Sequence, residues 1–484
     1  MKRKALISVV LSMSLVLGMT GCSSGNTKET EAAGTTTSSE TAATSTAETT
    51  SEKVSEPVTV SFYSPLPTIQ EQYDSAASRY KDATGNDVEM TLIYNESYKD
   101  KLKVSMASNS APDIFAHWSG GPMNSYIQED LIIDLTPYME ESGLKDRIME
   151  SSLQMGTYDG KIYAVAAGGD LMVFPLFYNK EIFAQYNLEV PETLDELETV
   201  CDTLKENGII PFALANLNKW TGSAYYMYLV DRYGGPDAFY NAANRVNGGS
   251  FEDEAFVKAG ETIQKWVNNG YFPDGVNGLD NSTGQDRQLL YTGKAAMFIY
   301  PTSVIAIIKD EMPDFADKIG IATFPVDGDD KEAAKRVVGS AGSNFLSISS
   351  NCENPDAAFA FIEELASEDT VTEMLEVGRC VPVNGIVDKV TDPLRQNALN
   401  MLQDATYVQL AYDQYLSPVL GEKHKDTTQE LFGLTMTPEE AAKAMARQQT
   451  QNAQQAQQKN DKVQGSSQGQ SSSSFGSNTT AKPQ

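Results

Sequence analysis

The stretch from residue 157 to residue 197 constrains the fold more than any other part of this chain. It contains two apolar runs, Ile162 to Val165 and Leu171 to Phe177, which have the composition of buried strands. The glycine pair Gly168-Gly169 separates these runs, and a capping box formed by Thr193 and Glu196 marks a later helix start. This order of strand, glycine break, strand and helix is expected where a chain leaves one α/β lobe and enters another.

The size and net charge of the chain limit the classes of protein to which it can belong. Its 484 residues are too many for one ordinary domain and enough for two lobes with sizeable cores. The formal net charge of −29 argues against binding to nucleic acid or to anionic lipid surfaces. Two histidines and four cysteines leave little material for a metal site, and neither a metal nor a cofactor is predicted. The aspartates at 325–330 match no calcium loop and indicate a solvated turn.

The N-terminus predicts export. Residues 2–4 are basic, and residues 5–17 form an apolar segment too short for a comfortable membrane span. Cys22 follows small residues in a pattern that resembles a bacterial lipobox, with Met19 where leucine is usual. We therefore expect residues 1–22 to be a lipoprotein signal segment and Cys22 to be lipidated. The alternative is an ordinary signal peptide with an incidental cysteine.

Two segments are expected to lack a packed core. Residues 23–56 have almost no aliphatic bulk and predict a disordered tether. Its r.m.s. reach would be about 30–35 Å for a flexible chain of this length. Residues 447–484 are mostly Gln, Ser, Asn and Lys and are also predicted to be disordered. Between these segments Cys201 is expected in a helix core, while the sequence leaves open whether Cys352 and Cys380 pair.

Several motifs in a fixed order carry a family resemblance. They are APD at 111–113, Trp118 with Gly120-Gly121, DGK at 159–161, YNK at 178–180, GYF at 270–272 and GKAAM at 293–297. From about Val58 to about Ala444 the chain resembles the extracellular solute-binding proteins that feed ABC importers, in particular the sugar-binding group. The resemblance implies a periplasmic-binding-protein-like α/β fold, with two interleaved lobes, a hinge and a ligand cleft between the lobes.

Reading the elements in order gives expected boundaries and candidate contacts. Lobe one is expected at 57–165 and 301–347, and lobe two at 166–300 and 348–446. Ligands of open α/β sheets bind beyond the carboxyl ends of the strands, so polar and aromatic residues at such ends are candidates. The candidate ligand-binding residues are Ser64, Trp118, Ser119, Asp170, Trp220, Tyr300, Ser343 and Asn344.

The two candidate tryptophans suggest how a ligand would be held. Trp118 and Trp220 are expected to lie against the C–H faces of a sugar ring, while Asp170 accepts hydrogen bonds from hydroxyl groups. The alternative for each of these tryptophans is a place in the core. Trp266 is assigned to the core because it shares a helical stripe with apolar residues. Tyr300 is a candidate substitute for a family aromatic that is missing at 301–304.

These features predict a lipid-anchored solute-binding subunit on the extracellular face of the cell membrane. It would be a monomer that binds a mono- or oligosaccharide and delivers it to the transmembrane subunits of an ABC permease. An enzyme is not predicted, because no motif pairs two carboxylates for glycoside hydrolysis and no G-x-S-x-G occurs. The alternatives are a non-sugar ligand, a receptor role for a sensor kinase or, least favoured, a secreted glycoside hydrolase. Few cations occur in the candidate loops, which favours a neutral ligand over an anion.

Overall fold

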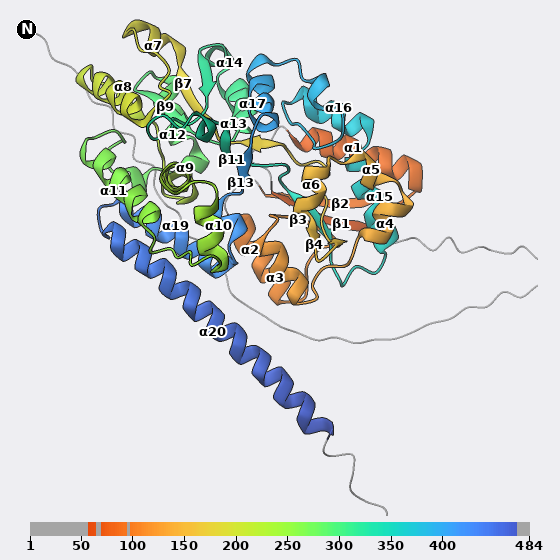
Figure 1. Cartoon of the computed structure of the whole chain (residues 1–484). Helices are drawn as coiled ribbons and strands as arrows, with labels where there is room; N and C mark the ends of the chain where they lie inside the picture. Colours follow the sequence, from red (N-terminus) through yellow and green to blue (C-terminus); the bar gives the residue numbers. More distant parts are fainter. Residues whose placement is uncertain (1–56, 64–68, 94–96, 472–484) are drawn as a thin grey trace, which may run out of the picture. The chain divides into compact units, whose positions relative to one another are not determined.

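The computed structural model describes residues 57–63, 69–93 and 97–471, with side chains described as far as residue 458. Figure 1 labels many of its helices and strands. Ser64, Cys22, the signal segment at 1–22 and the tether at 23–56 lie outside the described residues. Every helix within the described ranges is too short or too polar to cross a lipid bilayer.

The first lobe is built on a four-stranded sheet of order β12-β3-β1-β2. Strands β1 and β2 pair in parallel, as the β-α-β order of the sequence requires, and β3 is also parallel to β1. Strand β12, far along the chain, is antiparallel to β3. The elements up to β3, with β12, are β1 (Val58–Tyr63), α1 (Gln70–Thr84), β2 (Val88–Ile93), α2 (Ser97–Ala107), β3 (Ile114–His117) and β12 (Phe345–Ile348).

The second lobe is built on a four-stranded sheet of order β10-β7-β9-β8. Strand β9 is buried along its whole length, between β7 and β8. The predicted apolar stripe on α11 is confirmed, because Trp266 is fully buried and its ring stacks on Phe212 at 5.8 Å. The strands, with two long helices, are β7 (Leu176–Asn179), β8 (Ile210–Phe212), β9 (Ala295–Ile299), β10 (Ile319–Ala322), α9 (Trp220–Gly234) and α11 (Glu254–Asn268).

A third sheet, the connecting sheet, holds the stretches that lead from one lobe to the other. Its order is β13-β11-β6, with β6 (Met172–Val173), β11 (Arg336–Ser340) and β13 (Tyr407–Gln409). Strand β6 precedes β7 of the second lobe, and β11 leads from β10 back to β12 of the first lobe. Strand β13 precedes α19, which packs on α9 of the second lobe. The central strand β11 is thus hydrogen-bonded on both sides.

The remaining elements cover the sheets or join them. The capping box of α8 is confirmed, since the Thr193 hydroxyl accepts the Glu196 N–H and the Glu196 carboxylate accepts the Thr193 N–H, both at 3.2 Å. Elements from 121 to 206 are α3 (Gly121–Gln128), α4 (Thr136–Glu141), α5 (Leu144–Arg147), α6 (Glu150–Met155), β4 (Thr157–Tyr158), β5 (Lys161–Ile162), α7 (Lys180–Gln185) and α8 (Leu194–Glu206). Later helices are α10 (Asp237–Asn244), α12 (Gln285–Tyr291), α13 (Val304–Glu311), α14 (Pro313–Ala316), α15 (Pro355–Leu365), α16 (Glu368–Glu376), α17 (Pro393–Gln403), α18 (Tyr412–Tyr415), α19 (Pro418–Phe432) and α20 (Pro438–Ser471).

The strand pairing divides the chain differently from the expected boundaries. The stretch 301–347 was expected in lobe one, but β10 pairs with β7 in the second sheet. The stretch 348–446 was expected in lobe two, but α15 and α16 pack on α1 of the first lobe. There Arg79 donates to Glu364 at 2.7 Å and to Glu373 at 2.6 Å. These partners are far apart in sequence, so chain order alone could not assign them.

The prediction of a disordered tail from residue 447 is wrong for its first part. Helix α20 continues without interruption to Ser471 (Figure 1). Residues 447–458 contain no proline or glycine and are rich in Gln and Ala, which favour helix even where there is little apolar surface to bury. Gln449 also donates to the carbonyls of Ala242 and Ala243, at 2.9 and 2.8 Å. Residues 472–484 lie outside the described residues.

The three cysteines of the described residues are free, so Cys352 and Cys380 do not pair. Cys201 is fully buried on α8, as expected of a small core residue. Burial raises the pKa of the Cys352 thiol to about 12 and also raises the pKa of Cys380. Neither thiol is therefore disposed to ionise and react near neutral pH.

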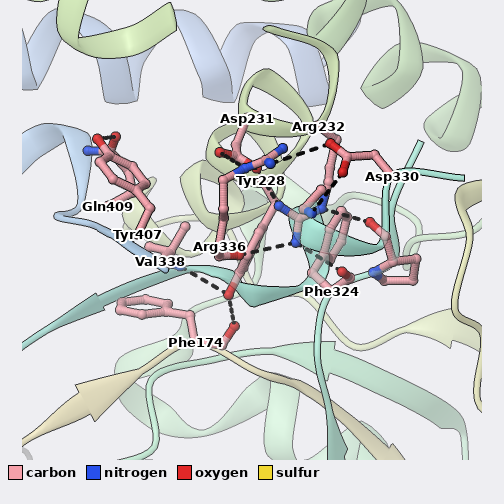
Figure 2. A network of polar contacts seen from close by, with 12 residues as sticks. Phe174, Tyr228, Asp231, Arg232, Phe324, Asp330, Arg336, Val338, Tyr407 and Gln409 are labelled. Carbon is pink, nitrogen blue, oxygen red and sulfur yellow. Dashed lines mark hydrogen bonds and ion pairs between the residues drawn. The ribbon is translucent and has the colours of Figure 1, made fainter. Parts of the chain in front are cut away.

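A polar network ties the second lobe to the connecting sheet (Figure 2). The buried Tyr228 hydroxyl of α9 donates to the Phe174 carbonyl at 2.7 Å and accepts the Val338 N–H at 3.2 Å. One side chain thus holds the segment after β6 and the strand β11. Beside it, the Arg232 guanidinium donates to the carbonyls of Pro325 and Phe324, both at 3.0 Å.

Replacement of Tyr228 by phenylalanine is expected to lower the free energy of unfolding by about 1–3 kcal/mol, because the buried Val338 N–H loses its acceptor. Urea unfolding followed by circular dichroism measures the change. The matched control is Tyr233→Phe on the same helix, a half-buried residue whose hydroxyl is hydrogen-bonded to the Thr262 hydroxyl. Equal loss of stability in the two variants would contradict the role given to Tyr228.

Candidate functional site

A cavity of about 170 Å³ lies where residues of both lobes and of the connecting sheet meet. Trp118, directly after β3, and Lys99 of α2 come from the first lobe. Trp220, the first residue of α9, and Tyr300, directly after β9, come from the second lobe. Aromatic rings placed at strand and helix ends, with polar tips among them, form the kind of wall that binds small molecules.

The structure brings together most of the residues predicted from the sequence. Trp118, Trp220, Tyr300, Ser343 and Asn344 all line this cavity. Ser119 instead lines a second cavity of about 630 Å³, where its buried Oγ has no hydrogen-bond partner within the described part of the chain. Asp170 lines neither cavity, and Ser64 lies outside the described residues.

The two cavity tryptophans are half-buried, and neither is enclosed in the core as Trp266 is. The ammonium group of Lys99 lies 4.4 Å from the centre of the Trp118 ring. Trp220 meets the ring of Tyr300 edge-on, with ring centres 5.2 Å apart. These contacts hold both rings in place, with the Lys99 ammonium over one face of Trp118, and both rings keep part of their surface exposed.

Asn281 is a cavity residue that the sequence analysis missed. Its side-chain N–H donates to the Tyr300 hydroxyl at 2.7 Å, which fixes the orientation of the amide. Its carbonyl oxygen Oδ1 is buried and has no hydrogen-bond partner among the residues that the structure describes. A buried acceptor of this kind is unfavourable unless something donates to it, and a ligand hydroxyl group can do so. The isolated Asn-Ser-Thr triplet at 281–283 carried no signal of this role.

The role predicted for Asp170 does not fit its position. Its carboxylate accepts the Cys380 N–H at 2.9 Å and forms an ion pair with Arg395, and both charged side chains are buried. Asp170 therefore connects the glycine pair before β6 to a loop and a helix more than 200 residues later. Its own N–H donates to Ser343 Oγ at 3.0 Å, which positions the cavity loop between β11 and β12. Sequence could not reveal that this aspartate already has a cationic partner.

The candidate loops offer few cations, as the sequence indicates, but cations reach the cavity from other parts of the chain. Lys99, Arg287 and Arg379 all line the cavity. The Lys99 ammonium lies 3.4 Å from the Asp413 carboxylate, and Arg287 forms an ion pair of 2.6 Å with Glu311. None of the three belongs to the loops that were chosen as candidates, because each reaches the cavity from a helix or from a turn after one.

Two buried histidines support the cavity wall from behind. His424 lies 2.6 Å from Ser223 Oγ, and Ser223 lines the cavity. His117, next to Trp118, lies 2.7 Å from Ser347 Oγ. Burial lowers the pKa of each imidazole to about 4. Both rings are therefore neutral at physiological pH and hold hydroxyl groups in place without adding charge.

Comparison with known proteins shows what this arrangement resembles. Residues 64–372 match the model of the bacterial extracellular solute-binding protein family. The multiple sugar-binding protein of Streptococcus mutans is 27% identical over 316 residues, which cover 64% of this chain and 71% of that protein. An ABC transporter extracellular-binding protein of Pyrococcus horikoshii is 28% identical over 198 residues, which cover 40% of this chain and 43% of that protein. The match with the second relative thus spans less than half of its length.

Solved structures extend the likeness over most of the chain. A structure from work on xylan utilization by Caldanaerobius polysaccharolyticus has 30% identity and a TM-score of 0.73, and the match covers 81% of this chain and 99% of that one. A chitin oligosaccharide binding protein has a TM-score of 0.74 at 23% identity, with 82% of this chain and 98% of that one covered. The fold is therefore the two-lobed, periplasmic-binding-protein-like α/β fold that the sequence predicts.

The histidines make a testable contribution to pH stability. The pKa of an unfolded histidine is about 6.5, and the folded values lie near 4. Between these two pKa values the unfolded chain binds more protons than the folded protein. The contribution of the histidines to the free energy of unfolding is therefore complete above about pH 6.5 and is lost as the pH falls toward 4. We expect urea midpoints to fall from pH 7 to pH 5. The NMR signals of both imidazoles should show no titration above about pH 5, and a midpoint near 6.5 for either ring would contradict its burial.

Proposed function

The chain belongs to the bacterial extracellular solute-binding protein family, and we propose that it binds a carbohydrate between its lobes and delivers it to the permease of an ABC importer. The observation that carries this proposal is the cavity with an indole from each lobe, Trp118 and Trp220. Sugar rings present C–H faces that pack on indoles and hydroxyl groups that need polar partners. The names of the S. mutans relative and of the chitin oligosaccharide binding protein agree with such a ligand.

The lobes provide a means of coupling binding to transport. A ligand that contacts residues of both lobes stabilises the closed arrangement, and the connecting sheet is the segment about which the lobes would turn. In this proposal the closed form docks on the transmembrane subunits of the permease. The protein acts as a monomeric binding protein and not as an enzyme, in keeping with the relatives, which are named as binding proteins.

Cell-surface attachment completes the proposal. The lipobox-like sequence before Cys22 and the basic and apolar segments ahead of it suggest lipidation at that cysteine. The lipid would hold the protein on the extracellular face of the cell membrane, and residues 23–56 would link it to the two lobes. Metabolic labelling with a fatty acid tests this part, because Cys22→Ala should abolish incorporation of the label.

Calorimetric titration with a panel of sugars tests the ligand class. The panel contains glucose, galactose, xylose, their β-linked di- and trisaccharides, and the matching uronic acids. We expect at least one compound to bind with a dissociation constant in the micromolar range or below, with closure seen as a smaller radius of gyration in X-ray scattering. Absence of heat from every sugar in the panel would count decisively against a carbohydrate ligand.

Removal of either indole should weaken binding of the sugar that the panel identifies. Trp118→Ala and Trp220→Ala are each expected to raise the dissociation constant by at least ~10-fold, about 1.4 kcal/mol, because each loses one face of the ring contact. The matched control is Tyr240→Ala, an aromatic on α10 that is 49% exposed and does not line the cavity. Unchanged affinity in both tryptophan variants would exclude the stacking arrangement even if a sugar binds.

A further inference from the structure

Arg379 reaches the cavity because of the way helix α16 ends. Gly378 adopts a φ of +79°, in the left-handed region that favours glycine. The Gly378 N–H donates to the Leu375 carbonyl at 2.9 Å, and the Arg379 N–H donates to the Met374 carbonyl at 2.8 Å. These two bonds form a Schellman motif, which reverses the chain direction and aims the residue after the glycine away from the helix axis. The arginine is thus placed at the cavity wall by a rigid helix end.

The Arg379 side chain is a buried cation without a partner. The residue is 2% exposed and lines the cavity. No hydrogen bond or ion pair links its guanidinium group to any residue that the structure describes, and its buried Nε is one of the polar atoms left without a partner. Taking an isolated charge out of water is strongly unfavourable, and a folded protein keeps such a group mainly where a ligand compensates for it.

Neither of the acidic groups near Arg379, the Asp170 carboxylate and the Tyr73 phenol, neutralises the charge of its guanidinium group. The Asp170 carboxylate, which accepts the N–H of the adjacent Cys380, is already paired with Arg395. Burial raises the pKa of the neighbouring Tyr73 phenol, and the positive charge of Arg379 opposes that rise without removing it, so Tyr73 supplies no negative charge.

The other charged residues of the cavity wall balance one another. Lys99 is paired with Asp413, and Arg287 is paired with Glu311. Among the described residues that line the cavity, one positive charge, that of Arg379, therefore has no counterpart.

We propose that the carbohydrate bound between the lobes carries a carboxylate, as a uronic acid does, and that Arg379 binds this group. The inference rests on the proposed function and specifies its substrate class. A guanidinium group presents paired N–H donors that match the two oxygens of a carboxylate. A single carboxylate balances the one uncompensated charge, whereas a phosphate dianion would exceed it. A neutral sugar would leave the guanidinium charge buried and uncompensated.

Because the whole chain is strongly acidic, binding of an acidic ligand depends on the positive charge of Arg379 in the cavity. With a net charge of −29, the protein repels anions at long range. An acidic sugar is therefore recognised only if the cavity itself supplies a desolvated positive group, which Arg379 does. The Asn281 carbonyl oxygen, also without a partner, accepts a hydroxyl group of the same ligand in this arrangement.

Calorimetric titration of matched pairs tests the proposal on the unmodified protein. The pairs are D-galacturonate with D-galactose, D-glucuronate with D-glucose, and the corresponding disaccharides. We expect the acidic member of at least one pair to bind roughly 10- to 100-fold more tightly than the neutral member, the range of a hydrogen-bonded charge pair. Binding of neutral members in preference to every acidic one would overturn this inference and leave the carbohydrate proposal standing. If no member of either kind binds, both proposals fail.

Variants at position 379 test whether Arg379 causes the preference for the acidic sugar. Arg379→Gln should remove the preference for the acidic sugar, and Arg379→Lys should restore part of it, because lysine keeps the charge but not the paired donors. Arg245→Gln is the control, since it makes the same change in net charge at an exposed residue outside the cavity.

The stability of the ligand-free protein separates ligand binding from a structural role. Without a partner to lose, Arg379→Gln should leave the thermal midpoint unchanged or higher. A clear fall in that midpoint, or an acidic preference that survives the substitution, would show that Arg379 is not the carboxylate-binding residue.

Discussion

The arrangement of the two lobes depends on one constraint. The buried backbone of the stretches that pass between the lobes must remain hydrogen-bonded. Three connecting stretches meet this requirement together by forming the sheet β13-β11-β6. The Tyr228 hydroxyl adds one bond to each of two of these stretches and attaches them to α9. Because the loop with Ser343 and Asn344 directly follows β11, the geometry of the connecting sheet also determines where the cavity loop lies.

Two kinds of group line the cavity, namely aromatic rings and polar side chains. Each lobe contributes one indole, so non-polar area lies on both sides of the cavity. Some of the polar groups are fixed in advance by bonds to the protein, as Asn281 is through Tyr300. Polar groups that are oriented in advance lower the ordering cost of binding a ligand.

Several local sequence signals were reliable, although the helix that continues through residues 447–458 was not predicted. The capping box at Thr193, the parallel pairing of β1 with β2 and the core stripe ending at Trp266 were all predicted and are all present. Each depends on residues a few positions apart or on one short crossover. The predictions for the lobe boundaries and for Asp170 failed because each required a partner distant in sequence. Asp170 is predicted to contact a ligand, because nothing nearby in the sequence indicates that its ion-pair partner is Arg395, 225 residues later.

The sequence by itself determined the class of this protein, because motif order and hydrophobic periodicity are properties of the chain read from end to end. It also identified both cavity indoles, since each follows a strand-like apolar run. Only the tertiary structure decided how the chain is shared between the lobes and which charges in the cavity are compensated. Strand pairing and ion pairing join residues hundreds of positions apart, and burial makes the charge of Arg379 costly where the described residues offer it no partner.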